Sequence, residues 1–311
     1  MDAVDAIHAM AEGRARVFFG MGGNFAAATP DTEATEAALR SCELTVHVST
    51  KLNRSHLVHG ERALILPCLG RSEIDLQAAG PQRVTVEDSM SVVHASEGKL
   101  TPASEHLLSE PAIVARMAEA TLGISAIPWS SLVEDYDRIR DRIARVIPGF
   151  EGYNERIEAR DGFYLGNSAA ERRWKTESGR AELAVHPIPD LGLEPGLLRL
   201  MTPRSHDQYN TTVYSDDDRY RGVRGARRVI FCHPDDLAER AISPGESVNL
   251  TSVYADGERR VESFQTIAYD IPRGCAAGYF PELNPLVSLR SVATTSNTPT
   301  SKWIPVRMER A

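Results

Sequence analysis

The chain has 311 residues, of which 42% are hydrophobic and 25% are charged. This is the composition of an ordinary globular protein, and it excludes a chain that is disordered throughout. At roughly 150 residues per domain, the length predicts two domains. The formal net charge is −8, so the overall charge gives no case for binding nucleic acid or an anionic membrane. Any anionic ligand must therefore be held by local groups.

The sequence shows no membrane span, export signal or cysteine-ligated metal site. Its apolar runs are far shorter than the roughly 20 residues of a spanning helix, and the opening residues 1–5 (MDAVD) are acidic. The four cysteines are far apart and include no CxxC pair, so neither a zinc knuckle nor an iron–sulfur cluster is indicated. Free thiols fit a reducing compartment. We therefore expect a cytoplasmic protein.

The first half of the chain alternates between helical and strand patterns. In chain order the expected elements are a helix at 2–12, a buried strand at 16–19, a helix from Pro30 to about Ser41 capped by Thr29, and strands at 44–48 and 62–66. This order is typical of a parallel α/β sheet. Residues 1–150 are therefore expected to form an α/β, Rossmann-like domain.

The middle of the chain predicts a short β excursion followed by helices and a linker. The expected elements are strands at 83–86 and 90–95, a helix at 112–122 capped by Ser109, and one long helix at 132–146 that begins with a capping box of Ser131 and Glu134. Residues 151–195 have weak periodicity and several glycines and prolines. We interpret them as a linker with some extended structure.

Residues 196–311 have a different character, with short strands separated by turn residues. The expected strands are 197–202, 210–214, 227–232, 246–251, 260–268 and 304–309, with one helical turn near Pro234–Arg240. This pattern predicts a compact β-barrel with little helix.

A glycine-rich turn, Gly20-Met21-Gly22-Gly23-Asn24, lies between an expected strand and an expected helix. Exposed backbone here suits the approach of a phosphate, and Gly22, Gly23 and Asn24 are candidate binding residues. The NAD fingerprint is not met, because Phe25 stands where a third glycine or alanine belongs and Thr50 replaces the acidic ribose ligand. A tight structural turn is the simpler interpretation of these five residues alone.

A second polar loop, at residues 50–56, follows the next expected strand. In open α/β sheets, ligands bind outside the carboxyl ends of the strands. Thr50, Asn53 and Ser55 are therefore candidates for contacts with a nucleotide base or ribose. A solvated loop explains the same residues equally well.

A third polar segment follows the expected strand at 197–202. The consecutive residues 205–207 (Ser-His-Asp) point in different directions, so they do not form a hydrolase triad. In a ligand rim, Arg204 would offer a fork for phosphate, and Gln208 and Asn210 would offer amide edges. The candidate residues are Thr202, Arg204, His206, Gln208, Tyr209, Asn210, Thr211 and Thr212.

Two further patterns are weaker. Asn284 would pair with a heterocycle edge and Lys302 with a phosphate, although a barrel-closing turn accounts for both. The basic residues between 219 and 228 follow three aspartates, which is typical of a solvated loop. His47 and His94 lie inside strand patterns and are interpreted as structural. No histidine or carboxylate spacing argues for a metal site in this chain.

Three segments in order carry a resemblance to a known family. They are residues 17–31 (VFFGMGGNFAAATPD), residues 227–252 (RRVIFCHPDDLAERAISPGESVNLTS) and the Asn-x-Leu and Thr-Pro-x-x-Lys elements of residues 283–302. Together they resemble the C-terminal part of a formate-dehydrogenase-like molybdopterin oxidoreductase. The branch that they resemble is the one linked to acid resistance.

The resemblance implies a cofactor and a partner. The cofactor would be molybdopterin guanine dinucleotide, in the bis form with molybdenum in the intact enzyme. The α/β part would hold one dinucleotide arm, and a C-terminal double-psi barrel would close over the pterins. The N-terminal half, or a subunit that bears the molybdenum, would be the partner, with a small-molecule substrate. This chain would supply no catalytic residue and no metal ligand. Many members of the family that it resembles carry a Glu-Thr pair after the second strand, where this sequence has Thr50-Lys51-Leu52-Asn53.

A different class of function remains open. The chain would then be a non-catalytic pterin- or nucleotide-binding module, or a partner subunit. A third alternative, an NAD-dependent enzyme, conflicts with the failed fingerprint at Phe25 and Thr50.

Overall fold

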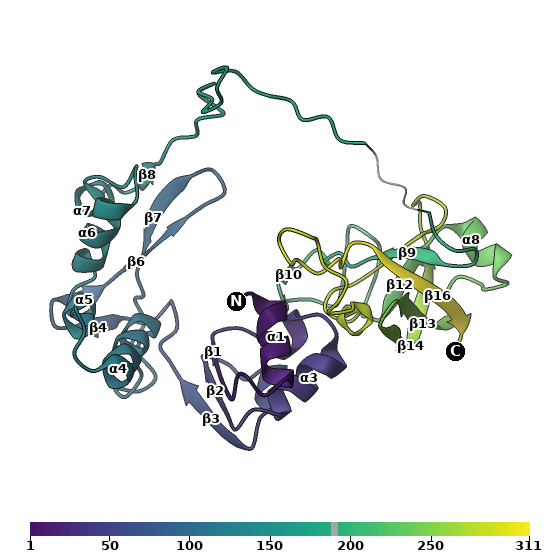
Figure 1. The fold of residues 1–311 in the computed structure, drawn as a ribbon, viewed down its shortest axis with the longest axis horizontal. Coiled ribbons are helices and arrows are strands. Elements are labelled where there is room, and N and C mark those ends of the chain that lie inside the picture. The colour runs from purple at the N-terminus through teal and green to yellow at the C-terminus, as the bar shows by residue number, and fades with distance from the viewer. Residues whose placement is uncertain (188–191) are drawn as a thin grey trace. The chain divides into compact units, whose positions relative to one another are not determined.

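The computed structural model describes residues 1–187 and 192–311. Contacts divide these residues into two compact units (Figure 1). The first unit joins residues 1–66 to residues 192–311, and the second contains residues 67–187. The sequence predicted one α/β domain up to residue 150. The observed division instead places the early α/β elements with the barrel.

The first 67 residues form a three-stranded sheet with helices along one side (Figure 1). The elements are α1 (Ala3–Ala11), β1 (Val17–Met21), α2 (Phe25–Ala28), α3 (Thr32–Arg40), β2 (Leu44–Ser49), the 3-10 turn η1 (Arg54–Leu57) and β3 (Arg62–Pro67). The sheet order is β1-β2-β3, and β1 pairs with β2 in parallel. The core between the helices includes Val4, Ile7 and Leu39, which are almost fully buried. The expected helix and strands are therefore present in this part.

Two expectations for this part were wrong in detail. Thr29 does not cap α3 but ends α2, because its backbone N–H and its hydroxyl both donate to the carbonyl of Phe25, at 3.1 and 2.8 Å. Asp31, in the left-handed region at φ 49°, is the residue that precedes α3. The first strand is half-buried rather than buried, because β1 lies at the edge of the sheet.

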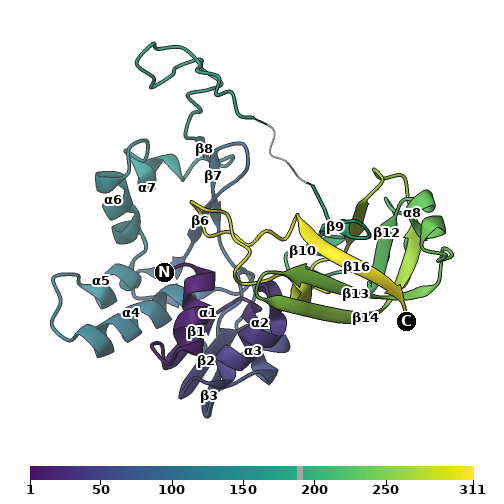
Figure 2. The same cartoon turned by 45° about the vertical axis from the view of Figure 1, so that its right-hand side comes forward.

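The C-terminal part closes into a six-stranded barrel, as Figure 2 shows for β13, β14 and β16. The strands are β9 (Leu198–Met201), β12 (Val229–Cys232), β13 (Ser247–Tyr254), β14 (Gly257–Ala268), β15 (Cys275–Gly278) and β16 (Ile304–Arg310). Their order is β12-β14-β13-β16-β9-β15, with parallel pairs β12–β14 and β9–β15. Leucine, isoleucine, valine and phenylalanine side chains with no exposed surface fill it. The predicted β-barrel is therefore confirmed.

The remaining elements of this part lie between the barrel strands. They are β10 (Gln208–Tyr209), β11 (Thr212–Val213), α8 (Pro234–Glu239) and the 3-10 turn η2 (Asn284–Leu286). The helical turn expected near Pro234 is α8. Strand β15 was not predicted, because its sequence, CAAG, has none of the β-branched or aromatic residues typical of strands. Pairing with β9 and β12 makes it a strand.

Direct contacts join the α/β elements to the barrel within this unit. The Arg259 guanidinium bonds Asp31 at 2.6 and 2.8 Å and Asp256 at 2.8 and 3.1 Å. The Asn284 amide donates to the carbonyl of Ala27 at 2.7 Å, and the Asp31 N–H donates to the carbonyl of Asn284 at 3.1 Å. The α/β part is thus attached to the barrel by a mostly buried ion-pair network and by backbone contacts.

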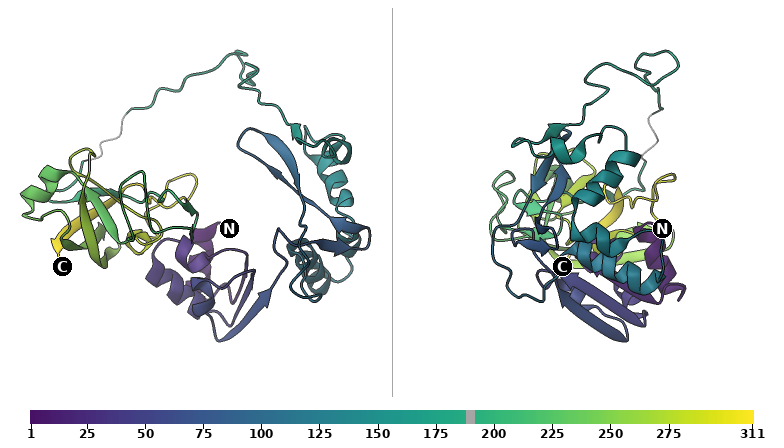
Figure 3. Two further views of the ribbon diagram at one scale, coloured as in Figure 1. Left: turned by 180° about the vertical axis from the view of Figure 1, so that it is seen from behind. Right: turned by 90° about the vertical axis from the view of Figure 1, so that its left-hand side faces the viewer.

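The second unit consists of small sheets and four helices (Figure 3). Its elements are β4 (Asp75–Gln77), β5 (Gly80–Gln82), β6 (Val84–Glu87), β7 (Val92–Ser96), α4 (Glu110–Leu122), α5 (Trp129–Glu134), α6 (Asp137–Val146), α7 (Tyr153–Arg156) and β8 (Phe163–Tyr164). β4 pairs with β5, and β6-β7-β8 form a second sheet. The expected strands at 83–86 and 90–95 correspond to β6 and β7. No helix in the described residues has the length and apolarity needed to cross a bilayer.

The single long helix expected at 132–146 is interrupted. Asp135 is extended and separates α5 from α6, and the predicted capping box does not start a helix there. The Tyr136 N–H donates to the Gln82 side chain at 2.7 Å. The Tyr136 hydroxyl bonds Asp75 and, at 2.9 Å, the Ser109 hydroxyl. Tertiary hydrogen bonds therefore outweigh the helical periodicity here, and Ser109 precedes α4 without capping it through its side chain.

Candidate cofactor-binding site

The loops after β1 and β2 meet, as parallel strands predict. The Asn53 amide donates to the carbonyl of Gly23 at 3.2 Å, and the Ser55 hydroxyl lies 3.2 Å from the Asn24 side-chain oxygen. The Ala26 N–H donates to the Ser55 hydroxyl at 3.0 Å. The structure thus brings together two of the residue groups singled out in the sequence.

Within these loops the structure separates supporting residues from accessible ones. Ser55 is fully buried. Its hydroxyl accepts from the Ala26 N–H of α2 and bonds the Asn24 side-chain oxygen. Ser55 therefore supports the turn and does not face a ligand. Gly22 has φ 75° and donates to the carbonyl of Val48 at 2.8 Å, so the turn itself requires a glycine there. A Cβ at Gly23 would meet no protein atom within 4 Å. The exposed backbone at Gly22 and Gly23 is therefore open to a ligand.

Aromatic and imidazole rings lie directly beneath the glycine turn. The Phe18 ring lies 5.0 Å from Phe25 and 5.6 Å from His47, and the His47 and His56 rings are 5.2 Å apart. Burial, with a smaller contribution from the His56 charge, lowers the pKa of His47. His56 Nδ1 accepts from the Asn53 N–H at 3.0 Å. His47 is therefore a buried neutral residue that supports the turn. His94 pairs with Asp88 instead, at 2.9 Å.

The barrel rim places two cationic side chains close together. The Lys302 ammonium donates to the carbonyl of Thr202, a buried residue whose N–H and hydroxyl donate to the carbonyl of Ser301 at 3.1 and 2.9 Å. Burial and the charge of Arg204 lower the pKa of Lys302. Among the described residues, Arg204 is engaged through its carbonyl alone, which accepts from Arg221 at 3.2 Å. In the part of the chain that the structure describes, neither cation pairs with a carboxylate. This arrangement favours an anion.

The Gln208 amide does not offer the free edge expected from the sequence. Its oxygen accepts from the Ser205 N–H at 3.0 Å and from Arg227 at 3.1 Å, and its nitrogen donates to the carbonyls of Asn210 and Phe280, both at 2.7 Å. Every polar atom of this side chain is therefore used to fold the rim. The expectation of a ligand contact by Gln208 does not hold in this conformation.

Arg227 is the residue of this region that the sequence did not single out. It was grouped with a solvated basic run, yet its side chain is only 11% exposed. Its guanidinium donates two hydrogen bonds to the Glu282 carboxylate, at 2.5 and 3.0 Å, and one to the Ser205 hydroxyl at 2.8 Å. Its place at the start of an apolar strand was the available signal, because a charge next to a buried strand needs a partner. Arg227 holds the rim in place.

The rest of the polar segment forms an exposed hairpin. β10 and β11 pair Tyr209 with Thr212, and Asn210 at φ 52° makes the turn together with Thr211. Tyr209 is 73% exposed, so it and its neighbours are accessible to a ligand. His206 Nε2 lies 2.7 Å from the Arg219 guanidinium, and its ring packs edge-on against Tyr220.

Asn284 is a bridge between the two parts of the unit. Asn284 is buried and its amide nitrogen donates to the carbonyl of Ala27, so this nitrogen is not free to pair with a heterocycle, contrary to the expectation from the sequence. A few residues earlier, the Phe280 N–H donates to the carbonyl of Pro203 at 2.9 Å. The short segment 280–284 thus contacts both the Arg204 rim and the helical turn that follows Asn24.

Comparison with known families shows which type of domain the barrel resembles. Residues 198–305 match the family described as the molydopterin dinucleotide binding domain. The barrel resembles a molybdopterin dinucleotide-binding domain. The match covers β9 to the start of β16 and includes the rim with Arg204 and Lys302.

Two curated relatives extend the likeness to nearly the whole chain. An uncharacterized oxidoreductase of Mycobacterium tuberculosis, Rv2900c, is 52% identical over 315 residues, which cover 99% of this chain and 40% of the relative. Protein YdeP of Escherichia coli K12 is 47% identical over 314 residues, which cover 99% of this chain and 41% of the relative. The chain therefore spans about two fifths of the length of these relatives.

A solved structure supports the fold. Acetylene hydratase from Pelobacter acetylenicus matches with a TM-score of 0.59 and 13% identity, covering 99% of this chain and 46% of that one. The resemblance to molybdopterin oxidoreductases seen in the sequence is confirmed by the family match and the relatives together.

Proposed function

We propose that this chain is the C-terminal, cofactor-binding part of a formate-dehydrogenase-like oxidoreductase and that it binds molybdopterin guanine dinucleotide. The observation that carries the proposal is the pair of cations at the barrel rim, Arg204 and Lys302, which have no carboxylate partner among the described residues. They lie within the segment that matches a dinucleotide-binding domain.

The chemistry of the rim fits a diphosphate. A guanidinium binds phosphate oxygens in a fork, and an ammonium binds them as a point charge. The lowered pKa of Lys302 shows that its charge is disfavoured by burial and by Arg204, and a phosphate between the two cations would relieve both effects. The exposed backbone of Gly22 and Gly23 adds a surface that a phosphate can approach closely.

The residues that would contact the cofactor follow from their accessibility. They are Gly22, Gly23, Thr50, Asn53, Arg204, His206, Tyr209, Asn210, Thr211, Thr212 and Lys302, with Asn24, Ser55, Thr202, Gln208 and Asn284 as their supports. When bound in the intact enzyme, in its bis form, the cofactor supplies a molybdenum centre that exchanges two electrons with a small substrate. The residues of this chain bind and orient the dinucleotide, and none is assigned as an acid, a base or a metal ligand.

The relatives suggest a partner for this chain. Because the match covers about two fifths of their length, we propose that a further part of the oxidoreductase provides the molybdenum ligand and the substrate site. It would be either an N-terminal half or a separate subunit that bears the molybdenum. We propose that this chain functions in the cytoplasm.

The proposal is tested by cofactor affinity. We expect the purified chain to bind molybdopterin guanine dinucleotide, followed by pterin fluorescence, and Arg204→Gln and Lys302→Gln each to weaken binding about 10- to 100-fold, which corresponds to ~1.4–2.8 kcal/mol. Arg224→Gln is the matched control, because Arg224 is exposed in the same region of the barrel domain. Unchanged affinity in both rim variants, or no binding by the unmodified chain, would refute the assignment.

A further inference from the structure

The second unit buries few apolar side chains for its length. Of the 40 buried hydrophobic side chains in the described residues, seven lie between residues 67 and 187. They are Cys68, Val93, Ala112, Ala115, Tyr136, Tyr153 and Ile157. Folding about 120 residues costs conformational entropy that burial of apolar surface has to offset. A unit with so small a core is short of that compensation.

The missing burial corresponds to an open apolar groove. Helices α4, α5 and α6 and strand β6 surround a hollow of about 510 Å³. The apolar part of its lining includes Val84, Val114, Trp129, Leu132, Val133 and Ile139. We call this hollow the α4–α5 groove. Val114 is 46% exposed, and the Trp129 Nε1–H is buried without an acceptor among the described residues. The groove therefore offers apolar surface.

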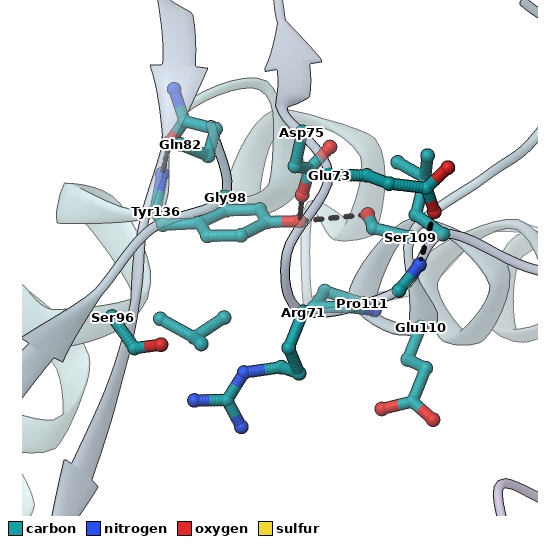
Figure 4. A pocket seen from close by; sticks show the side chains of 13 residues that line it. Arg71, Glu73, Asp75, Gln82, Ser96, Gly98, Ser109, Glu110, Pro111 and Tyr136 are labelled. Atoms are coloured by element: carbon teal, nitrogen blue, oxygen red, sulfur yellow. Dashed lines mark hydrogen bonds between the residues drawn. The ribbon is translucent and has the colours of Figure 1, made fainter. Parts of the chain in front are cut away.

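Charged groups stand at the edge of the groove, where it adjoins a small polar pocket of about 70 Å³ (Figure 4). In that pocket the Tyr136 hydroxyl is held by Asp75 and Ser109, and Glu73 accepts backbone N–H groups. Arg71 and Glu110 line both hollows and pair with no charged residue in the described part of the chain. An apolar centre with a charged rim is the anatomy of a protein–protein interface.

We propose that the α4–α5 groove is the docking surface for the rest of the oxidoreductase polypeptide. The relatives carry the larger part of their length outside the region that they share with this chain, so in those proteins further polypeptide accompanies this region. The occupant is an apolar segment of that polypeptide with charges that complement Arg71 and Glu110. This inference rests on the proposed function, because it identifies where the proposed partner binds.

The experiment combines binding with hydrogen–deuterium exchange. The probe is the polypeptide of the M. tuberculosis relative that lies outside the matched region, added to the 311-residue chain. We expect a complex in which the amides of α4 and α5 exchange at least about tenfold more slowly than in the free chain. Val114→Asp, which places a carboxylate in the groove, should weaken the complex at least about tenfold. Leu122→Asp is the matched control, because Leu122 is on the same helix, 58% exposed and outside the groove lining.

The outcomes separate this inference from the proposed function. Unchanged exchange in α4 and α5, equal effects of the two substitutions, or no complex would overturn the docking surface. A dimer of this chain that Val114→Asp abolishes, seen by light scattering, would overturn it in favour of a second copy. Dinucleotide binding is measured in a separate experiment with variants of the barrel rim. A negative result in the docking experiment therefore does not affect the test of dinucleotide binding, and the reverse also holds.

Discussion

The Arg259 ion-pair network is one of the contacts that attach the α/β part to the barrel, and we expect Arg259→Met to destabilise the unit strongly. The Arg259 side chain is 17% exposed and its partners Asp31 and Asp256 are 9% and 13% exposed. Removing a partner from a buried ion pair costs about 3–5 kcal/mol, because the remaining charges stay buried without compensation. Since these groups keep slight access to water, we expect about 3 kcal/mol.

The assay is chemical unfolding of the full chain followed by circular dichroism, with hydrogen exchange used to assign the lost protection to α3 and β14. Arg260→Met is the matched control on the same strand. Its side chain is 48% exposed and pairs with Glu262 and Glu309, so its loss should cost no more than about 1 kcal/mol. Equal effects of the two substitutions would refute the argument from burial.

The same network predicts a pH dependence. The hydrogen bond from Arg259 lowers the pKa of Asp256 from its ordinary value of 3.8. A carboxyl whose pKa is lowered in the folded state contributes stability above the unfolded-state value and loses it as the pH falls through the folded-state value. The penalty of Arg259→Met should therefore be full at neutral pH and shrink below pH 3.8. A penalty that is constant down to pH 2 would show that packing, not charge, carries the effect.

Three further outcomes follow from single residues. Burial lowers the pKa of His47 below its ordinary value of 6.5, so the stability of the fold should decline as the pH falls below 6.5. In thermal unfolding, His47→Phe should reduce that decline. A pH profile of stability that is unchanged in this variant would contradict a buried neutral imidazole. Gly22→Ala should cost about 1–2 kcal/mol in chemical unfolding because of its positive φ, whereas Gly23→Ala should be nearly neutral for stability and weaken dinucleotide binding. Burial raises the pKa of Cys232 to about 12, so this thiol should resist a thiol reagent at pH 8 that labels the less buried Cys275; rapid labelling of Cys232 would show that the barrel opens.

Local patterns were sufficient where burial of one face of an element fixes its order of apolar and polar residues. The helix at 2–12, the strand at 44–48 and the barrel strands other than β15 follow from periodicity, because burial on one face selects the same residues that make the pattern. The meeting of the glycine turn with the loop at 50–56 was also predictable. Parallel strands bring their carboxyl ends to one edge, and Asn53 and Gly23 do meet there.

The failures at Tyr136, Gln208 and Asn284 share one physical cause, which is competition from distant partners. Tyr136 is bonded to Gln82, Asp75 and Ser109, and those bonds break the expected long helix. Gln208 and Asn284 have the amides that a heterocycle would need, but in the fold the amide nitrogen of each donates to a backbone carbonyl. Sequence alone identifies the type of group but not whether a folded neighbour has already used its hydrogen-bonding capacity.

That competition also explains why the two cations of the rim have no carboxylate partner among the described residues. Arg227 takes the acidic partner available nearby, Glu282, and ties Ser205 and the carbonyl of Phe280 to the same guanidinium. Segment 202–208 is thereby folded without a carboxylate on Arg204 or Lys302 in the described part of the chain, and the Lys302 ammonium donates to the carbonyl of Thr202. A rim held by its own ion pair needs little rearrangement to bind a diphosphate, so less of the binding energy is lost to ordering the site. The buried ion pair and the unpaired cations are therefore two parts of one arrangement, in which the first keeps the second available.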